Sequence, residues 1–279
     1  MHRRFRIFLF LCCAFLTTGA FAQTARFTPA EIAGTYSISS EFFSHNIILR
    51  PDGTFAASAM SDSCEVNPKN PNDCLNYPQD SGTFSVSGSI VRFRVLNYRR
   101  WASPNQSIIP PSRYFEKIVL KWSERFYLLD KTELKNFANA VNLRTEPRKD
   151  TGIGFANYFF LRREGVETPV VGLPDLPGGW NDLLLKAPVR ATVLSIKSAD
   201  GKRFAVIDKG RDDGLKIGMQ MVTWFFPSGS EIVAVTKKTA TVRMKSRSAE
   251  GQEFLEPGDV ISTRFEPFWF MKLKPRAKR

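Results

Sequence analysis

Residues 82–95 read GTFSVSGSIVRFRV, and this stretch decides the fold class. In its second half Val91, Phe93 and Val95 alternate with arginines, so an extended chain would place them on one face. Ser87-Gly88-Ser89 supplies a turn between the two apolar runs. The stretch therefore predicts a β-hairpin with one buried and one charged face.

Two further hairpins are predicted nearby. Pro51-Asp52-Gly53 follows an apolar run, and proline and glycine suit the backbone angles of a tight turn. Ile118, Leu120 and Trp122 alternate before a turn at Ser123-Glu124-Arg125. We expect residues 23–164 to form a β domain.

One helix is expected in this domain, at about residues 131–142. Asp130 is placed to cap its first amides, and Glu133 three residues later completes a capping-box pattern. Leu134, Phe137 and Val141 recur on one helical face.

Residues 165–188 contain four prolines and four glycines and predict a connector. Between residues 189 and 267, short apolar runs alternate with turns such as Asp200-Gly201, Pro227-Ser228-Gly229-Ser230 and Pro257-Gly258-Asp259. That spacing favours a small β-barrel. The expected fold class is mainly β with one or two helices.

The amino terminus has the three parts of a secretory signal peptide. Three arginines precede the apolar run Ile7 to Leu16, and Ala20-Phe21-Ala22 suits a signal peptidase. A membrane span needs about 20 apolar residues, which this run lacks. We expect residues 1–22 to be removed, and the rest to be periplasmic or secreted without a transmembrane span.

Two cysteines, Cys64 and Cys74, remain after that cleavage. In an oxidising compartment they are most simply one disulfide, worth about 2–3 kcal/mol by the chain-entropy estimate. His45 is the only histidine left and no CxxC is present, so we expect no metal and no cofactor.

Positive charge is concentrated towards the carboxyl end. The chain has 40 Lys and Arg against 27 Asp and Glu, and residues 189–279 hold 18 of the former and 10 of the latter. For an exported protein this favours an envelope protein or an anionic surface as partner, such as lipid head groups, lipopolysaccharide or cell-wall polymer. Export argues against nucleic acid.

Residues 30–130 resemble a bacterial lipocalin-like domain. The similarity lies in Gly34-Thr35-Tyr36, the hairpin from Leu49 to Phe55, the loop between the two cysteines, and Gly82-Thr83-Phe84. It implies an antiparallel barrel or half-barrel, often with an apolar cup.

Residues 189–265 resemble small envelope barrels, such as the carboxy-terminal domain of flagellar assembly protein T and the barrels of rod-shape-determining protein C. The similarity lies in Val206 to Gly210, Asp213-Gly214-Leu215, Gly218-Met219 and Pro257 to Val260. It implies a non-enzymatic interaction module.

Two groups of residues are candidates for binding. Arg144 and Arg148 could form a fork for a carboxylate or phosphate, or an internal ion pair with Glu146. The tail, residues 268–279, combines aromatic and basic side chains that suit a lipid interface or a partner, but could instead pack on the barrel and end in solvent. Its candidate contacts are Trp269, Phe270, Lys272, Lys274 and Arg276.

No catalytic site is predicted. His45 lies in a strand pattern and no G-x-S-x-G is present, so a serine hydrolase is disfavoured. Asp208, Asp212 and Asp213 suit turns better than a calcium loop. We expect a non-enzymatic binding or structural module. The alternatives are a carrier of a small apolar ligand and a carboxylate-dependent hydrolase of cell-wall glycans, for which Glu124, Glu133 and Glu146 are available.

Overall fold

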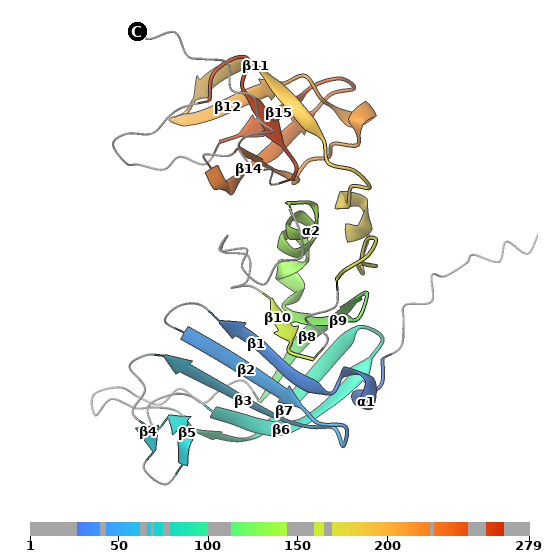
Figure 1. Cartoon of the computed structure of the whole chain (residues 1–279), viewed down its shortest axis with the longest axis vertical. Helices are drawn as coiled ribbons and strands as arrows, with labels where there is room; N and C mark the ends of the chain where they lie inside the picture. Colours follow the sequence, from blue (N-terminus) through green and yellow to red (C-terminus); the bar gives the residue numbers. More distant parts are fainter. Residues whose placement is uncertain are drawn as a thin grey trace, which may run out of the picture.

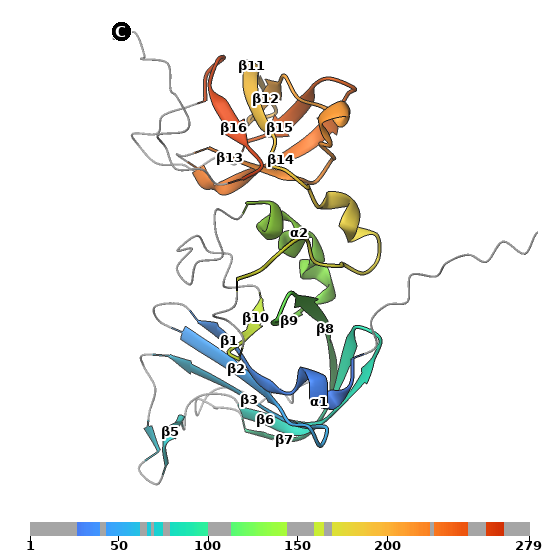
Figure 2. The ribbon, with the colours of Figure 1, turned by 45° about the vertical axis from the view of Figure 1, so that its right-hand side comes forward.

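The computed structural model describes residues 27–39, 43–61, 66–67, 70–74, 79–99, 113–143, 159–164, 169–223, 226–244 and 255–264. It contains two closed antiparallel barrels with helix α2 (Leu134–Leu143) between them (Figures 1 and 2). The predicted fold class, mainly β with barrels and few helices, is confirmed.

The first barrel has an up-and-down topology. Each strand pairs with the next strand of the barrel along the chain, and the last pairs with the first to close it. A separate small sheet, β4 (Val66–Asn67) and β5 (Asn70–Cys74), is inserted between the third and fourth strands. The barrel strands are β1 (Gly34–Ser39), β2 (Phe43–Leu49), β3 (Thr54–Ser61), β6 (Gln79–Ser87), β7 (Ile90–Arg99), β8 (Tyr114–Trp122), β9 (Arg125–Leu129) and β10 (Phe160–Arg162).

The hairpin of residues 82–95 forms as predicted. Ser87 pairs with Ile90 across a two-residue turn. Val91, Phe93 and Val95 are buried, whereas Arg92 and Arg94, which alternate with them, are exposed. The alternation in the sequence therefore separates the interior of the first barrel from its surface.

Aromatic side chains pack inside this barrel. The ring centroid of Phe93 lies 5.0 Å from that of Phe55 and 4.4 Å from that of Phe115. An eight-stranded barrel is just wide enough for side chains to fill it or for one small ligand. Six of the thirteen buried side chains in the described core of this barrel are aromatic.

The short helix α1 (Pro29–Ile32) packs at the barrel with a capping box that was not predicted. The Thr28 hydroxyl accepts from the Glu31 amide, and the Glu31 carboxylate accepts from the Thr28 amide at 2.7 Å. Ile32 is buried, and its carbonyl accepts a 2.8 Å hydrogen bond from the Tyr36 hydroxyl. Burial raises the pKa of Tyr36, so this hydroxyl stays a donor.

The middle of strand β8 is buried on both faces. Val119 faces the barrel interior. Ile118, Leu120 and Trp122, the alternating set seen in the sequence, belong instead to a second apolar cluster with α2. The outer face of β8 is therefore covered by the helix.

The predicted helix is present, but its predicted cap is wrong. A 3-10 turn, η1 (Lys131–Glu133), precedes α2, and Asp130 makes no side-chain capping bond. The Asp130 carboxylate instead accepts from Lys117 Nζ at 2.9 Å, and the Glu133 carboxylate accepts from Asn136 at 2.6 Å. Lys117 lies opposite on the neighbouring strand and competes with the helix amides for Asp130.

The second barrel has six strands, in the order β11-β12-β15-β14-β13-β16. Asp200 and Gly201 both have positive φ, 50° and 69°, as a type I′ hairpin turn requires. The strands are β11 (Arg190–Ala199), β12 (Lys202–Ile207), β13 (Gln220–Thr223), β14 (Phe226–Val235), β15 (Ala240–Arg243) and β16 (Val260–Ser262), with a 3-10 turn η3 (Arg211–Asp213) between β12 and β13.

The predicted turn at Pro227–Ser230 is wrong, because these residues lie within β14. Thr223 pairs with Phe226, so the chain reverses before the proline. Proline is tolerated near the start of a strand, which is where Pro227 lies.

The connector packs against its surroundings. Val171 N donates to the Ser123 hydroxyl at 2.7 Å, and Trp122 Nε1 donates to the Gly172 carbonyl at 3.2 Å. Its 3-10 turn η2 (Trp180–Leu183) brings Leu183 into the cluster around α2. The described connector is thus attached to the end of the β8–β9 hairpin and to the helix.

Candidate functional site

Helix α2 presents an apolar face to the first barrel. Phe137 is central to it, with ring centroids 5.0 Å from Tyr127, 5.1 Å from Phe159 and 6.5 Å from Trp122. Ala138 and Val141 are buried beside it. The same apolar cluster continues into the interior of the second barrel, so it joins the outer face of the first barrel to the core of the second.

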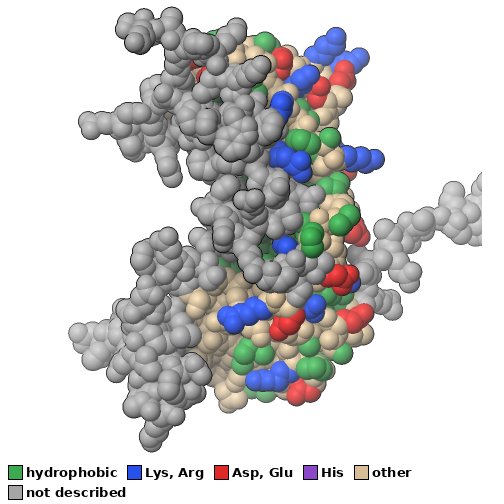
Figure 3. Space-filling view, in the orientation of Figure 1, with side chains coloured by type: hydrophobic (Ala, Val, Ile, Leu, Met, Phe, Trp, Pro, Cys, Tyr) green, Lys and Arg blue, Asp and Glu red, His purple; other side chains and the backbone are tan. Residues whose placement is uncertain are grey.

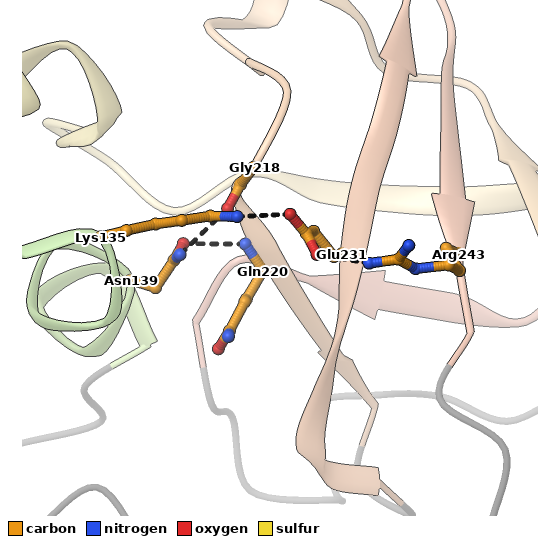
Figure 4. Close-up of polar contacts among 6 residues, drawn as sticks. All are labelled: Lys135, Asn139, Gly218, Gln220, Glu231 and Arg243. Carbon is orange, nitrogen blue, oxygen red and sulfur yellow. Dashed lines mark hydrogen bonds and ion pairs between the residues drawn. The ribbon is translucent and has the colours of Figure 1, made fainter. Parts of the chain in front are cut away.

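A polar stripe runs along the helix towards the second barrel and the connector. Lys135, Asn139 and Asn142 are spaced four and three residues apart, which places them on one side of a helix. Figure 4 shows the first two reaching from α2 to residues of the second barrel. We call these three residues the junction stripe.

Asn139 is 1% exposed and forms two hydrogen bonds with the second barrel. Its Nδ2 donates to the Gly218 carbonyl at 3.0 Å, and its Oδ1 accepts from Gln220 N at 2.8 Å (Figure 4). The amide thus binds a carbonyl and the N–H two residues later, as a neighbouring strand would.

Asn142 does the same with the connector. Its Nδ2 donates to the Leu183 carbonyl at 2.6 Å, and its Oδ1 accepts from Leu185 N at 2.9 Å. Both asparagines are buried and satisfied by backbone groups distant in sequence. They give the helix a specific register against both segments.

An ion-pair chain completes the junction. Lys135 Nζ lies 2.5 Å from Glu231 Oε1, and Arg243 lies 2.8 Å from the other carboxylate oxygen (Figure 4). The hydrogen bond from Lys135 is the main reason that the pKa of Glu231 is lowered, and the charges of Lys135 and Arg243 act in the same direction.

The glycines of the Asp213-Gly214-Leu215-Lys216-Ile217-Gly218 segment lie at this junction. Gly214 and Gly218 have φ of 87° and 90°, where other residues are strained. A Cβ on Gly218 would lie 3.1 Å from Lys135 Cε, and one on Gly214 would lie 3.3 Å from Leu185 Cδ2. These glycines therefore allow α2 and the connector to approach the second barrel.

Asp213 takes part in a turn within the second barrel. Its carboxylate accepts from Gly210 N at 2.9 Å and lies 3.4 Å from Lys209 Nζ. The Asp208 carboxylate accepts from Thr192 N at 2.7 Å. These contacts give both aspartates a local structural role. No group of three or more metal-ligating side chains occurs in the described part of the chain.

A cavity of about 390 Å³ opens beside the junction. It lies where the carboxyl end of α2, the connector and Arg264, the second residue after β16, meet. Its lining is about equally polar and apolar and includes two cationic side chains: Val141, Asn142, Gly172, Leu173, Leu185, Lys186, Ala187, Pro188 and Arg264.

His45 lies in strand β2, on the inward-facing side with Ile47 and Leu49. Its ring centroid is 5.0 Å from that of Phe160. Burial and the charge of Lys117 lower the pKa of His45, and the charge of Asp80 opposes them. Of the acidic candidates, Glu124 pairs with Lys121 at 3.6 Å and Glu133 binds Asn136.

Most predicted binding residues lie outside the described residues. These are Arg144, Glu146, Arg148, Trp269, Phe270, Lys272, Lys274 and Arg276, together with Cys64. Cys74 ends β5, but its side chain is not among those described. The structure therefore leaves these predictions as they stood.

The junction stripe was not predicted. Polar residues opposite the apolar face of a helix usually face solvent, so Asn139 and Asn142 did not by themselves indicate buried contacts. The available clue was their spacing, which places two short amides on one line of the helix.

Comparison with protein-family models, curated proteins and solved structures returned no match. Within the residues described, no helix has both the length and the apolar character needed to cross a membrane.

Proposed function

We propose that this chain is an exported, non-enzymatic protein of the cell envelope, in which the second barrel engages an anionic envelope component. The observation that carries the proposal is the charge of that barrel. Eight exposed basic residues and four exposed acidic ones lie among its described residues. Figure 3 shows Lys and Arg side chains projecting from its surface, with acidic ones among them.

Three of these cations form a compact patch. Arg211 N donates to the Thr236 carbonyl, and Asp212 N to the Lys237 carbonyl, both at 3.0 Å. These bonds hold the η3 segment against the β14–β15 turn. Arg211, Lys237 and Lys238, all exposed, lie on these two bonded segments together with the exposed Asp212, and the three cations are called the loop patch. Lys209 is nearby but lies 3.4 Å from the Asp213 carboxylate.

The junction supports a structural role for the rest of the chain. Asn139 and an ion-pair chain fix the second barrel on α2, and Asn142 fixes the connector on the same helix. The shared apolar cluster joins the second barrel to the first. A partner bound at the loop patch is thereby held at a set distance from the first barrel.

Vesicle co-sedimentation tests the proposal, with phosphatidylglycerol vesicles compared with neutral phosphatidylcholine vesicles. The purified protein should bind only the anionic vesicles, and less at high salt. Each cation near such a surface contributes about 1 kcal/mol, so Lys237→Gln/Lys238→Gln should weaken binding about 30-fold.

Lys197→Gln/Lys202→Gln is the matched control. It removes the same charge at the other end of β12, since Lys202 starts that strand and its last residue, Ile207, pairs with Ala240 beside the patch. This control should bind nearly as the wild type does. If both variants lost the same amount of vesicle binding, the loop patch would not be the binding site. If the wild type did not bind anionic vesicles, an anionic lipid would not be the partner.

A further inference from the structure

The cavity beside the junction combines a cationic and an apolar wall. Lys186 and Arg264 supply positive charge, and no acidic residue lines it among the described residues. Val141, Leu173 and Leu185 supply apolar surface. We propose that this cavity binds a small amphiphilic anion, with its charged head at Arg264 and Lys186 and a short alkyl chain against the apolar wall.

Arg264 is the residue that points to an anion. Its Nε is buried and has no hydrogen-bond partner in the described structure. Among the described residues, the only hydrogen bond of Arg264 is the one that its backbone amide donates to the Ser262 hydroxyl. A buried, charged donor without a partner is costly, and native proteins seldom keep one without a reason. An anion in the cavity would supply the missing counter-charge.

Arg162 makes the comparison clear. Its Nε is also buried without a partner. However, its Nη1 donates to the Glu31 and Ala33 carbonyls at 3.0 and 3.3 Å, and its guanidinium lies 4.2 Å from the Phe126 ring centroid. The guanidinium of Arg162 therefore already has partners in the first barrel, whereas that of Arg264 borders a cavity.

The remaining lining limits what can bind. Both amide atoms of Asn142 already bind the connector backbone, so the two cations are left to recognise the head group. Leu173 is 39% exposed, and its side chain can be covered by an alkyl chain. The volume of about 390 Å³ is at the lower end of the range of about 300–1,000 Å³ for small-ligand sites.

Binding should also strengthen the junction. The cavity walls come from α2, the connector and Arg264 just beyond β16, so a ligand would contact all three at once. A ligand that binds only the folded state raises its stability by mass action. This proposal does not depend on the loop patch, and either can fail while the other stands.

Calorimetric titration of the full-length protein tests the site. Octanoate is the probe. Acetate is the control that lacks the alkyl chain, and 1-octanol is the control that lacks the charge. Octanoate should bind at least tenfold more tightly than either control and raise the melting temperature. Equal binding of octanol, or no binding of octanoate, would overturn the proposal.

Arg264→Gln should weaken octanoate at least tenfold without lowering the melting temperature of the unliganded protein, because its buried Nε has no partner to lose. Lys202→Gln, which removes one exposed charge from the same barrel, should bind octanoate as the wild type does. If Arg264→Gln fails to fold, the exposed Lys186→Gln is used, with an expected weakening of about fivefold. Undiminished octanoate binding in the variant that is used would refute the assignment.

Discussion

At the scale of single residues, the most consequential feature is the pair of buried asparagines on α2. Each satisfies one backbone carbonyl and the N–H two residues later. Removing a partner from a buried polar group costs about 1–3 kcal/mol, because water cannot replace it. These two asparagines therefore contribute more to stability than polar side chains on a solvent-exposed helix face would.

Asn139→Ala should lower the free energy of unfolding by about 2–4 kcal/mol, since it leaves the Gly218 carbonyl and Gln220 N–H without partners in a buried site. Asn136→Ala is the control on the same helix. Its side chain binds only Glu133, one turn away, and the loss should stay below about 1 kcal/mol. Urea denaturation measures both, and equal losses would contradict the assigned role.

At the scale of elements, the ion-pair chain links α2 to strands β14 and β15. The folded-state pKa of Glu231 is lowered, chiefly by its hydrogen bond from Lys135. A carboxyl with a lowered folded pKa stabilises the protein above the pKa of the unfolded chain, ordinarily 4.5 here. That contribution is lost as the pH falls through the lower, folded pKa.

Glu231→Gln should therefore reduce stability at pH 7, and the difference from the wild type should shrink as the pH falls below about 4.5. Urea midpoints between pH 7 and pH 3 measure it. Glu124→Gln breaks a pair in which both side chains are largely exposed, and it should change the midpoint less at every pH. A difference for Glu231→Gln that is constant with pH would contradict this account.

The elements also show how far the sequence predicted the structure. Alternation at Val91 and Phe93 and the Asp200-Gly201 turn predicted strands and hairpins correctly, because those signals are local. The Asp130 cap failed because Lys117, distant in sequence, binds the carboxylate. Strand order, barrel closure and the role of Asn139 depend on partners far along the chain, which local patterns do not specify.

At the scale of the whole molecule, the two barrels are joined through one apolar cluster around α2. Its members come from β8, from the helix, from the connector and from the second barrel. Because neither barrel can unfold without exposing this shared surface, the barrels should behave as one cooperative unit.

Differential scanning calorimetry of the wild type should show a single transition. Asn139→Ala/Asn142→Ala releases the helix from the second barrel and the connector, and should separate this into two transitions. Two transitions in the wild type would show that the barrels are energetically independent.

The closure of the first barrel has a consequence for synthesis. Tyr36 in β1 pairs with Arg162 in β10. The first strand of the barrel to be synthesised therefore cannot complete its pairing until the last strand, β10, has been made. Bringing such distant segments together is slow. Until then β1 and β9 each keep an open edge, which other chains can join. A nascent or truncated polypeptide that stops before Phe160 is therefore the form most prone to aggregate.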